Sequence, residues 1–66
     1  MTITLNGSCR EIADGTTIEQ LLADFSLPDH GVAIAVNREV VPRSVWAQTR
    51  VPPDALVEVV TASKGG

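Results

Sequence analysis

The residues of this sequence that can do chemistry stand at its end, where Gly65 and Gly66 follow a valine-rich segment. A glycine pair contributes no packing and costs the most backbone entropy to order, so it suits a partner better than the protein's own core. Two glycines let an extended main chain enter a narrow channel and hydrogen-bond with its walls. We therefore interpret the Gly66 carboxylate as the candidate reactive group and Gly65 as the residue that allows entry into a channel.

The charged side chains form no catalytic constellation in the sequence. Five of them fall in expected turns, in loops or on a helix surface, where we expect them to be solvated: Asp14, Asp24, Asp29, His30 and Glu39. The Asp14-Gly15 pair is a turn signal, because the glycine run and the lysine of a phosphate-binding loop are absent. We therefore expect no catalysis by side chains, and the protein is not predicted to be an enzyme.

The single cysteine, Cys9, and the single histidine, His30, lie far apart in the sequence. This separation argues against a structural zinc site and against a Cys-His catalytic pair within the chain. A lone cysteine also excludes an internal disulfide. We expect Cys9 to be a small, half-buried apolar residue, and we expect the protein to bind neither a metal nor a cofactor of its own.

Composition narrows the possible partners. The 66 residues carry a formal net charge of -3, and the five Lys and Arg residues are scattered along the chain. With a pI of about 4.7 and no cluster of basic residues, the chain is not expected to bind nucleic acid or an anionic membrane. Its net negative charge is compatible with a basic partner. The N-terminus lacks the features of a secretory signal, and no apolar run approaches the roughly 20 residues of a membrane span. We therefore expect a cytoplasmic protein.

The elements that position the tail begin with a hairpin. Residues 2–5 alternate polar and apolar side chains, which predicts a short strand, and the Asn-Gly pair at 6–7 predicts a two-residue type I′ turn. The register of the return strand stays open at this point. A two-residue turn places Ile12 on the core face, whereas a bulged turn places Cys9 and Glu11 there.

The next segment has a helical period. Its apolar side chains recur at i, i+3, i+4 and i+7 and share one face of a helix: Ile18, Leu21, Leu22 and Phe25. One of the two threonines before this stripe can cap the helix, and an acid or amide three residues later completes a capping box. We expect the helix to end near Ser26, because Pro28 disfavours helical backbone at the residue before it.

The second half of the chain predicts three more strands. Residues 32–37 alternate valine or isoleucine with alanine, and residues 40–41 are long enough only for an edge strand. Residues 43–49 predict a helical turn and a loop, with Trp46 as the anchor. Residues 55–60 are almost continuously apolar, which predicts a strand with neighbours on both sides in the middle of the sheet.

This order of elements predicts an α+β fold. One helix crosses one face of a mixed sheet of four to five strands, and the last strand lies beside the first, which gives a small domain its two layers. We expect residues 1–61 to form this single domain. The small and polar residues 62–66 predict a flexible C-terminal tail.

The whole sequence resembles the ThiS-type sulfur carrier proteins of thiamin biosynthesis, which have the β-grasp, or ubiquitin-like, fold. The resemblance covers the strand that ends in "NG", the stretches "DGTTIEQLL" and "VAIAVNREVVPRSVWAQT", the valine-rich last strand and the closing "GG". Its most family-specific residues are Val36, Asn37, Val41, Pro42, Arg43 and Trp46.

The resemblance implies a function for the tail. According to the resemblance, a ubiquitin-activating-type adenylyltransferase uses ATP to adenylate the Gly66 carboxylate. The adenylate is then converted to a thiocarboxylate, which donates its sulfur to thiazole synthase. The sulfur comes from a donor such as a cysteine desulfurase persulfide. The protein is then a carrier and a co-substrate of these enzymes, and ATP is used by the activating partner.

Docking residues are expected beside the tail. Val41, Pro42 and Trp46 are predicted to form a docking face, together with Lys64 in the tail itself. The alternative for Trp46 is that its ring only closes one end of the core.

Two features depart from the family pattern. Relatives usually carry a Gly-Asp pair before the last strand, whereas residues 52–55 read Pro-Pro-Asp-Ala, so we expect a turn without positive φ. Relatives usually carry a small apolar residue before the glycines, whereas Ser63 and Lys64 place a cation beside the reacting carboxylate.

Other functions remain open. The small subunit of molybdopterin synthase shares the fold and the tail, although the stretch "VNREVVPR" argues against it. A carrier for tRNA thiolation or for cysteine synthesis would use the same chemistry. A ubiquitin-like modifier would join its tail to lysines of target proteins, and a plain interaction module would have an inert tail.

Overall fold

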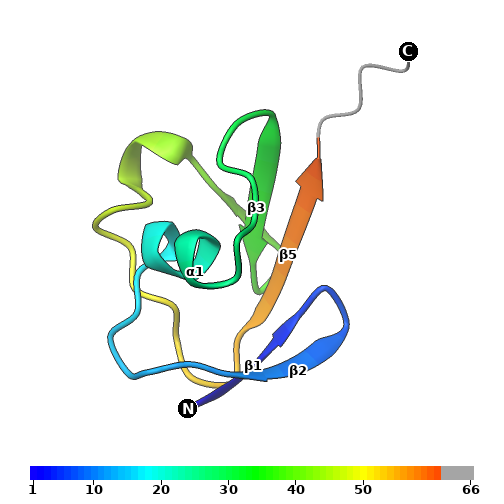
Figure 1. Cartoon of the computed structure of the whole chain (residues 1–66), viewed down its shortest axis with the longest axis vertical. Helices are drawn as coiled ribbons and strands as arrows, with labels where there is room; N and C mark the ends of the chain where they lie inside the picture. Colours follow the sequence, from blue (N-terminus) through cyan, green and yellow to red (C-terminus); the bar gives the residue numbers. More distant parts are fainter. Residues whose placement is uncertain (62–66) are drawn as a thin grey trace.

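The computed structural model describes residues 1–61 of the chain. Its elements are β1 (Thr2–Leu5), β2 (Ser8–Glu11), α1 (Ile18–Asp24), β3 (Val32–Val36), β4 (Glu39–Val41), the 3-10 helix η1 (Arg43–Val45) and β5 (Leu56–Thr61). The five strands form a sheet in the order β2-β1-β5-β3-β4. Strands β1 and β5 are parallel, and the other neighbours are antiparallel. Both α1 and η1 lie on one side of the sheet, as Figure 1 shows.

The β1–β2 hairpin has the tight turn that the Asn-Gly pair predicts. Asn6 and Gly7 have φ values of 49° and 83°, and Leu5 pairs directly with Ser8. This register places Ile12 on the core face, where it is buried, and excludes the bulged alternative. Cys9 therefore points to the opposite face and is exposed, so the expectation of a half-buried cysteine is wrong.

Helix α1 starts and stops where its local sequence predicts. Thr17 accepts a hydrogen bond from the Gln20 N–H (3.2 Å), and the Gln20 side chain accepts one from the Thr17 N–H (3.1 Å), which completes the capping box. The helix ends at Asp24, and Ser26 then has a positive φ of 54°. Because Pro28 disfavours helical backbone before it, the chain leaves the helix here.

The segment after η1 fastens the start of α1. The Ile18 N–H donates to the Thr49 carbonyl at 3.0 Å, and the Val51 N–H donates to the Thr16 carbonyl at 2.8 Å. The first N–H groups of a helix lack intrahelical acceptors, so a loop carbonyl satisfies one of them here. The loop and the helix are thereby fixed as one layer over the sheet.

Strand β5 lies in the middle of the sheet, as its apolar sequence predicts, and pairs with β1 on one side and β3 on the other. The turn that leads into it differs from expectation, because Asp54 has a positive φ of 59°. Proline followed by a residue with positive φ is the pattern of a type II turn, with Pro53 at the first central position. The Asp54 N–H donates to the Thr2 carbonyl at 3.0 Å, so pairing with the first strand holds the turn in this shape.

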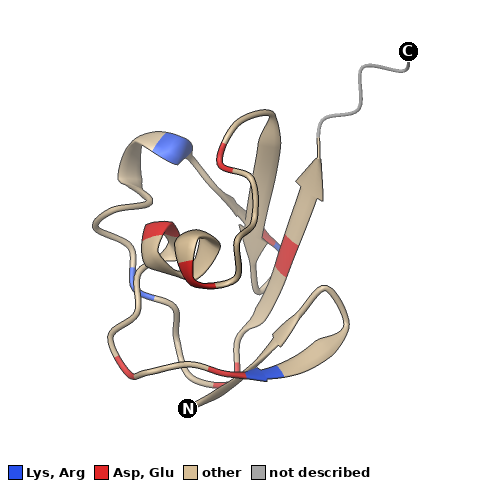
Figure 2. Ribbon diagram, viewed as in Figure 1, with Lys and Arg blue, Asp and Glu red and all other residues tan. Residues whose placement is uncertain are grey.

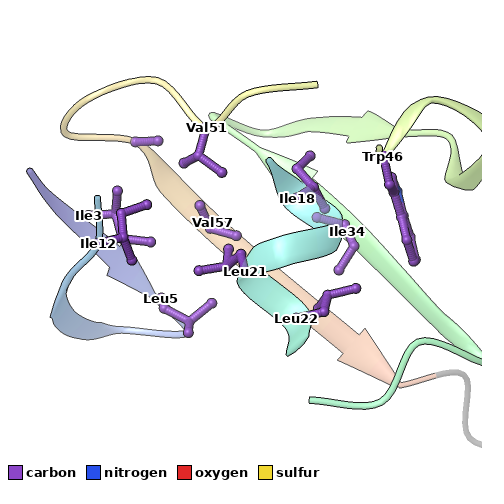
Figure 3. Packing of buried hydrophobic residues seen from close by; sticks show 11 residues of the cluster. Ile3, Leu5, Ile12, Ile18, Leu21, Leu22, Ile34, Trp46, Val51 and Val57 are labelled. Carbon is purple, nitrogen blue, oxygen red and sulfur yellow. The ribbon is translucent and has the colours of Figure 1, made fainter. Parts of the chain in front are cut away.

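One hydrophobic core fills the space between α1 and the sheet (Figure 3). Its buried members are Ile3, Leu5, Ile12, Ile18, Leu21, Leu22, Ile34, Trp46, Val51, Ala55 and Val57. Phe25, the last residue of the predicted helical stripe, is partly buried against this cluster. The Arg10 guanidinium lies 5.6 Å from the centre of its ring, so the hairpin closes over the end of the helix.

Candidate functional site

The predicted reactive residues follow the central strand. Strand β5 ends at Thr61, the last residue that the structure describes. Gly65, Gly66 and Lys64 lie outside the described residues, so their predicted roles stay predictions. The described part of the site is therefore the strand that leads to the tail and the groups that fix this strand.

Asn6 fixes β5 on the β1 side. Main-chain pairing between β1 and β5 runs to Leu5 and Val57, and the Asn6 N–H then donates to the Val57 carbonyl at 2.9 Å. Beyond this point the Asn6 carboxamide takes the place of a strand residue. Its Oδ1 accepts from the Val59 N–H at 2.8 Å, and its Nδ2 donates to the Val59 carbonyl at 3.3 Å.

Asn37 fixes the other end of β5 on the β3 side. Its Oδ1 accepts from the Leu56 N–H at 2.9 Å, and its own N–H donates to the Leu56 carbonyl at 2.7 Å. Asn37 has a φ of 51°, a conformation that asparagine tolerates better than most side chains. The sequence pattern alone does not predict this role for Asn6 or Asn37. The available signal was an asparagine directly after a strand, in a turn that needs positive φ.

The predicted docking residues of the folded body lie together but differ in exposure. Trp46 is only 5% exposed, and its Nε1 donates to the Val41 carbonyl at 2.8 Å. Pro42 is exposed and joins β4 to η1, as expected for a proline at a strand exit. Trp46 thus closes one end of the core, and it offers a partner little surface. Of the predicted docking residues that the structure describes, Pro42 presents the most accessible side chain.

A small polar cluster lies near η1 and the loop after α1. His30 Nδ1 and Asp29 Oδ1 are 2.8 Å apart, and the Arg43 guanidinium lies 3.4 Å from His30 Nε2. The hydrogen bond that Asp29 accepts from His30 lowers the pKa of Asp29, and the electrostatic attraction of His30 lowers it further. These side chains are exposed, and so are the other three residues that the sequence predicts to be solvated, Asp14, Asp24 and Glu39. The arrangement is that of a solvated surface cluster.

The charged and metal-ligating residues of the described chain are dispersed. Among residues 1–61, no group of three or more His, Cys, Asp or Glu side chains is placed to hold a metal ion. The basic residues of the described chain fall on separate segments of the ribbon, as Figure 2 shows. None of the helices in residues 1–61 has the length and apolar character needed to cross a membrane.

Comparison with known proteins gives consistent matches. A sequence model of the ThiS family matches residues 3–66. The sulfur carrier protein ThiS of Escherichia coli (strain K12) is 38% identical over 48 residues, which are 73% of each chain. The crystal structure of the thiamine biosynthesis protein (ThiS) from Geobacter metallireducens has a TM-score of 0.87 and 26% sequence identity, with 100% of both chains covered. That match confirms the β-grasp fold.

A longer relative also matches. A thiazole synthase of Paramagnetospirillum magneticum (strain ATCC 700264 / AMB-1) is 33% identical over 66 residues. The match covers all of this chain and 20% of the synthase, so the chain spans a fifth of that relative's length. The family model covers nearly the whole chain, and the solved structure shares its fold from end to end. The chain therefore belongs to the ThiS family.

Proposed function

We propose that this protein carries sulfur for thiazole formation in thiamin biosynthesis, as a thiocarboxylate on Gly66. The Gly66 carboxylate oxygen attacks the α-phosphorus of ATP, and the bond to pyrophosphate breaks. A sulfur nucleophile then attacks the acyl carbon, and AMP leaves. Hydrosulfide gives the thiocarboxylate directly, whereas a persulfide gives an acyl disulfide whose S–S bond a thiol must reduce.

The observation that carries this proposal is the family match, which extends through Gly66. The similarity to a protein named as a sulfur carrier supports the carrier role. The similarity to a thiazole synthase supports a thiazole synthase as the acceptor of the sulfur. Strand β5 is held on both sides by its neighbours and by the carboxamides of Asn6 and Asn37, so it offers a rigid base for a tail.

In this proposal the protein is a co-substrate of other enzymes in the cytoplasm. A ubiquitin-activating-type adenylyltransferase catalyses the adenylation of Gly66 with ATP, and a cysteine desulfurase persulfide supplies the sulfur. The five residues from Ala62 to Gly66 span at most about 14 Å when extended. This length lets Gly65 and Gly66 enter a cleft while the folded body, with Pro42 and Lys64, stays outside.

Deletion of Gly66 tests the proposal. The deletion shortens the tail by about 3.5 Å and should abolish adenylation, because the carboxylate no longer reaches the α-phosphorus. Each variant is incubated with ATP and the cognate adenylyltransferase while pyrophosphate release is followed. Mass spectrometry then detects sulfur in place of oxygen at the C-terminus, and the same spectrum of the natural protein establishes that Gly66 is its last residue.

Gly65→Val is the matched control for length. It keeps the tail length but adds a branched side chain where the proposal needs a narrow main chain, so it should also fail, by steric exclusion. Both variants should keep the melting temperature of the parent, because no described residue changes. If the Gly66 deletion is activated and thiolated like the parent, the carrier proposal is wrong. Isopeptide-linked adducts on target proteins would instead identify a modifier.

A further inference from the structure

A groove of about 310 Å³ lies on the helical side of the sheet, between α1 and η1. We call it the α1–η1 groove. The buried side chains of Leu22 and Trp46 form its floor. Glu19 lines it from α1, and Arg43 lines it from η1, and Figure 2 shows this division of charge between the two elements. The groove therefore has an apolar floor between an acidic and a basic wall.

The charges on the two walls are available to a partner. Within residues 1–61, neither Glu19 nor Arg43 forms an ion pair, and both residues are exposed. The Arg43 guanidinium lies 5.9 Å from the centre of the Trp46 ring and 3.4 Å from His30 Nε2. Because a guanidinium only donates, His30 Nε2 accepts this bond and Nδ1 donates to Asp29. These contacts hold Arg43 in place before a partner arrives, which lowers the entropy cost of docking.

The proposed function requires the carrier to contact two proteins at once. An acyl adenylate is hydrolysed by water, so the sulfur nucleophile has to attack while the adenylyltransferase still encloses the tail. The protein that brings the sulfur therefore needs a surface that lies near the start of the tail and leaves β5 accessible.

One end of the α1–η1 groove lies near the end of β5. Val32 pairs with Thr61, the last described residue of β5, and Asp29, which lines the groove, stands shortly before Val32 in the chain. The groove belongs to the helical layer, so a protein seated in it leaves the opposite side of the sheet uncovered (Figure 1). The groove thus meets both requirements for the sulfur donor.

We propose, resting on the proposed function, that the persulfide-bearing sulfur donor docks in the α1–η1 groove while the adenylyltransferase holds the tail. The donor presents an aliphatic side chain to the floor, a basic group to Glu19 and an acidic group to Arg43. An apolar floor with a few polar groups at its rim is the usual composition of a binding pocket. Opposite charges at fixed places give such an interface its register and suppress wrong partners.

Charge reversals with matched controls test this docking. Arg43→Glu and Glu19→Lys reverse the two walls, whereas Arg50→Glu and Asp24→Lys make the same changes at exposed positions outside the groove. Each carrier is mixed with ATP, the adenylyltransferase and varied amounts of the cognate cysteine desulfurase, which has been loaded with persulfide and freed of excess cysteine. The two groove variants should each raise the desulfurase concentration for half-maximal rate by about tenfold, and the two controls should keep the parent's value.

The readout is sulfur at the C-terminus, measured by mass spectrometry. The reaction is quenched in acid, and a reducing thiol is added only afterwards, so that the thiol cleaves the acyl disulfide but releases no free sulfide from the desulfurase during the reaction. Sulfur gained by the carrier in a single turnover then reports transfer from the docked donor.

Free sulfide separates docking from the chemistry of the tail. Sulfide needs no docking surface, so all four variants should be adenylated, and then thiolated by sulfide, at the parent's rate and with the parent's circular dichroism spectrum. The docking proposal is overturned if the groove variants accept sulfur from the desulfurase as well as their controls do. It is also overturned if folded groove variants lose adenylation itself, because the groove would then belong to the adenylyltransferase.

A binding measurement without ATP keeps this test independent of the carrier chemistry. Isothermal titration calorimetry of the desulfurase against each carrier reads docking alone. If Arg43→Glu binds about tenfold more weakly than the parent but no carrier is adenylated, docking in the groove stands and the proposed function fails. If the parent is adenylated and thiolated while Arg43→Glu binds the desulfurase as tightly as the parent, the carrier function stands and the donor docks elsewhere.

Discussion

The Asn6 carboxamide and the main chain of Val59 exchange two hydrogen bonds across 53 positions of the sequence, at 2.8 and 3.3 Å. The main-chain ladder between β1 and β5 ends at Leu5 and Val57, so this side chain adds the next step of the ladder. A turn residue of the first hairpin thereby stabilises the strand that leads to the tail.

Replacing Asn6 with glycine tests this relationship. Glycine accepts the positive φ of 49° at this position, so the change removes the carboxamide without straining the turn. The free energy of unfolding should fall by about 1 to 2 kcal/mol, because two hydrogen bonds are lost and water replaces them only in part. Chemical denaturation measures the loss, and amide exchange should show faster exchange at Val59.

Asn6→Asp is the matched control for this prediction. It keeps an acceptor for the Val59 N–H, but its second oxygen cannot donate and, when ionised, repels the Val59 carbonyl oxygen. Part of the stability loss should therefore remain, and it should shrink at low pH, where the protonated carboxyl can donate again. An unchanged denaturation midpoint for Asn6→Gly, together with unchanged exchange at Val59, would show that the carboxamide does not hold β5.

Asp54 offers a test of the turn before β5. Its φ of 59° strains any residue with a Cβ, and most of all a β-branched one. Asp54→Gly should stay within about 0.5 kcal/mol of the parent or exceed it, whereas Asp54→Val should lose about 1 to 2 kcal/mol. Thermal or urea denaturation of the pair measures the difference. Both variants keep the N–H that donates to Thr2, so equal stabilities would contradict the strained turn.

Leu22 tests the packing of α1 on the sheet. Its side chain is 2% exposed within the core, and Leu22→Ala should lower the free energy of unfolding by about 2 to 5 kcal/mol through lost burial and a cavity. That loss is a large part of the stability of a small domain. Asp24→Ala, on the exposed side of the same helix, should change stability by less than about 0.5 kcal/mol. A denaturation midpoint for Leu22→Ala as high as that of the Asp24 variant would refute the packing.

Much of the fold follows from the sequence because the deciding forces are local. The Asn-Gly pair accepts positive φ at both positions, which predicts the first turn, and the apolar stripe that begins at Ile18 and Leu21 predicts the helix and its buried face. The nearly continuous apolar run of the last strand predicts its place between two neighbours. The candidate reactive group, the Gly66 carboxylate, also comes from the sequence alone and stays a prediction.

Tertiary structure decided the features that depend on residues far apart in the chain. The sequence allowed two registers for the first hairpin, and burial of Ile12 in the core selects the one that exposes Cys9. Asp54 adopts a positive φ because its N–H is held by Thr2, a contact that no local pattern reveals. The hydrogen bonds from Asn6 to Val59 likewise form only when the two ends of the sequence pair as neighbouring strands. Local periodicity therefore specifies the elements, whereas contacts between distant segments decide which side chains fix the strand that leads to the tail.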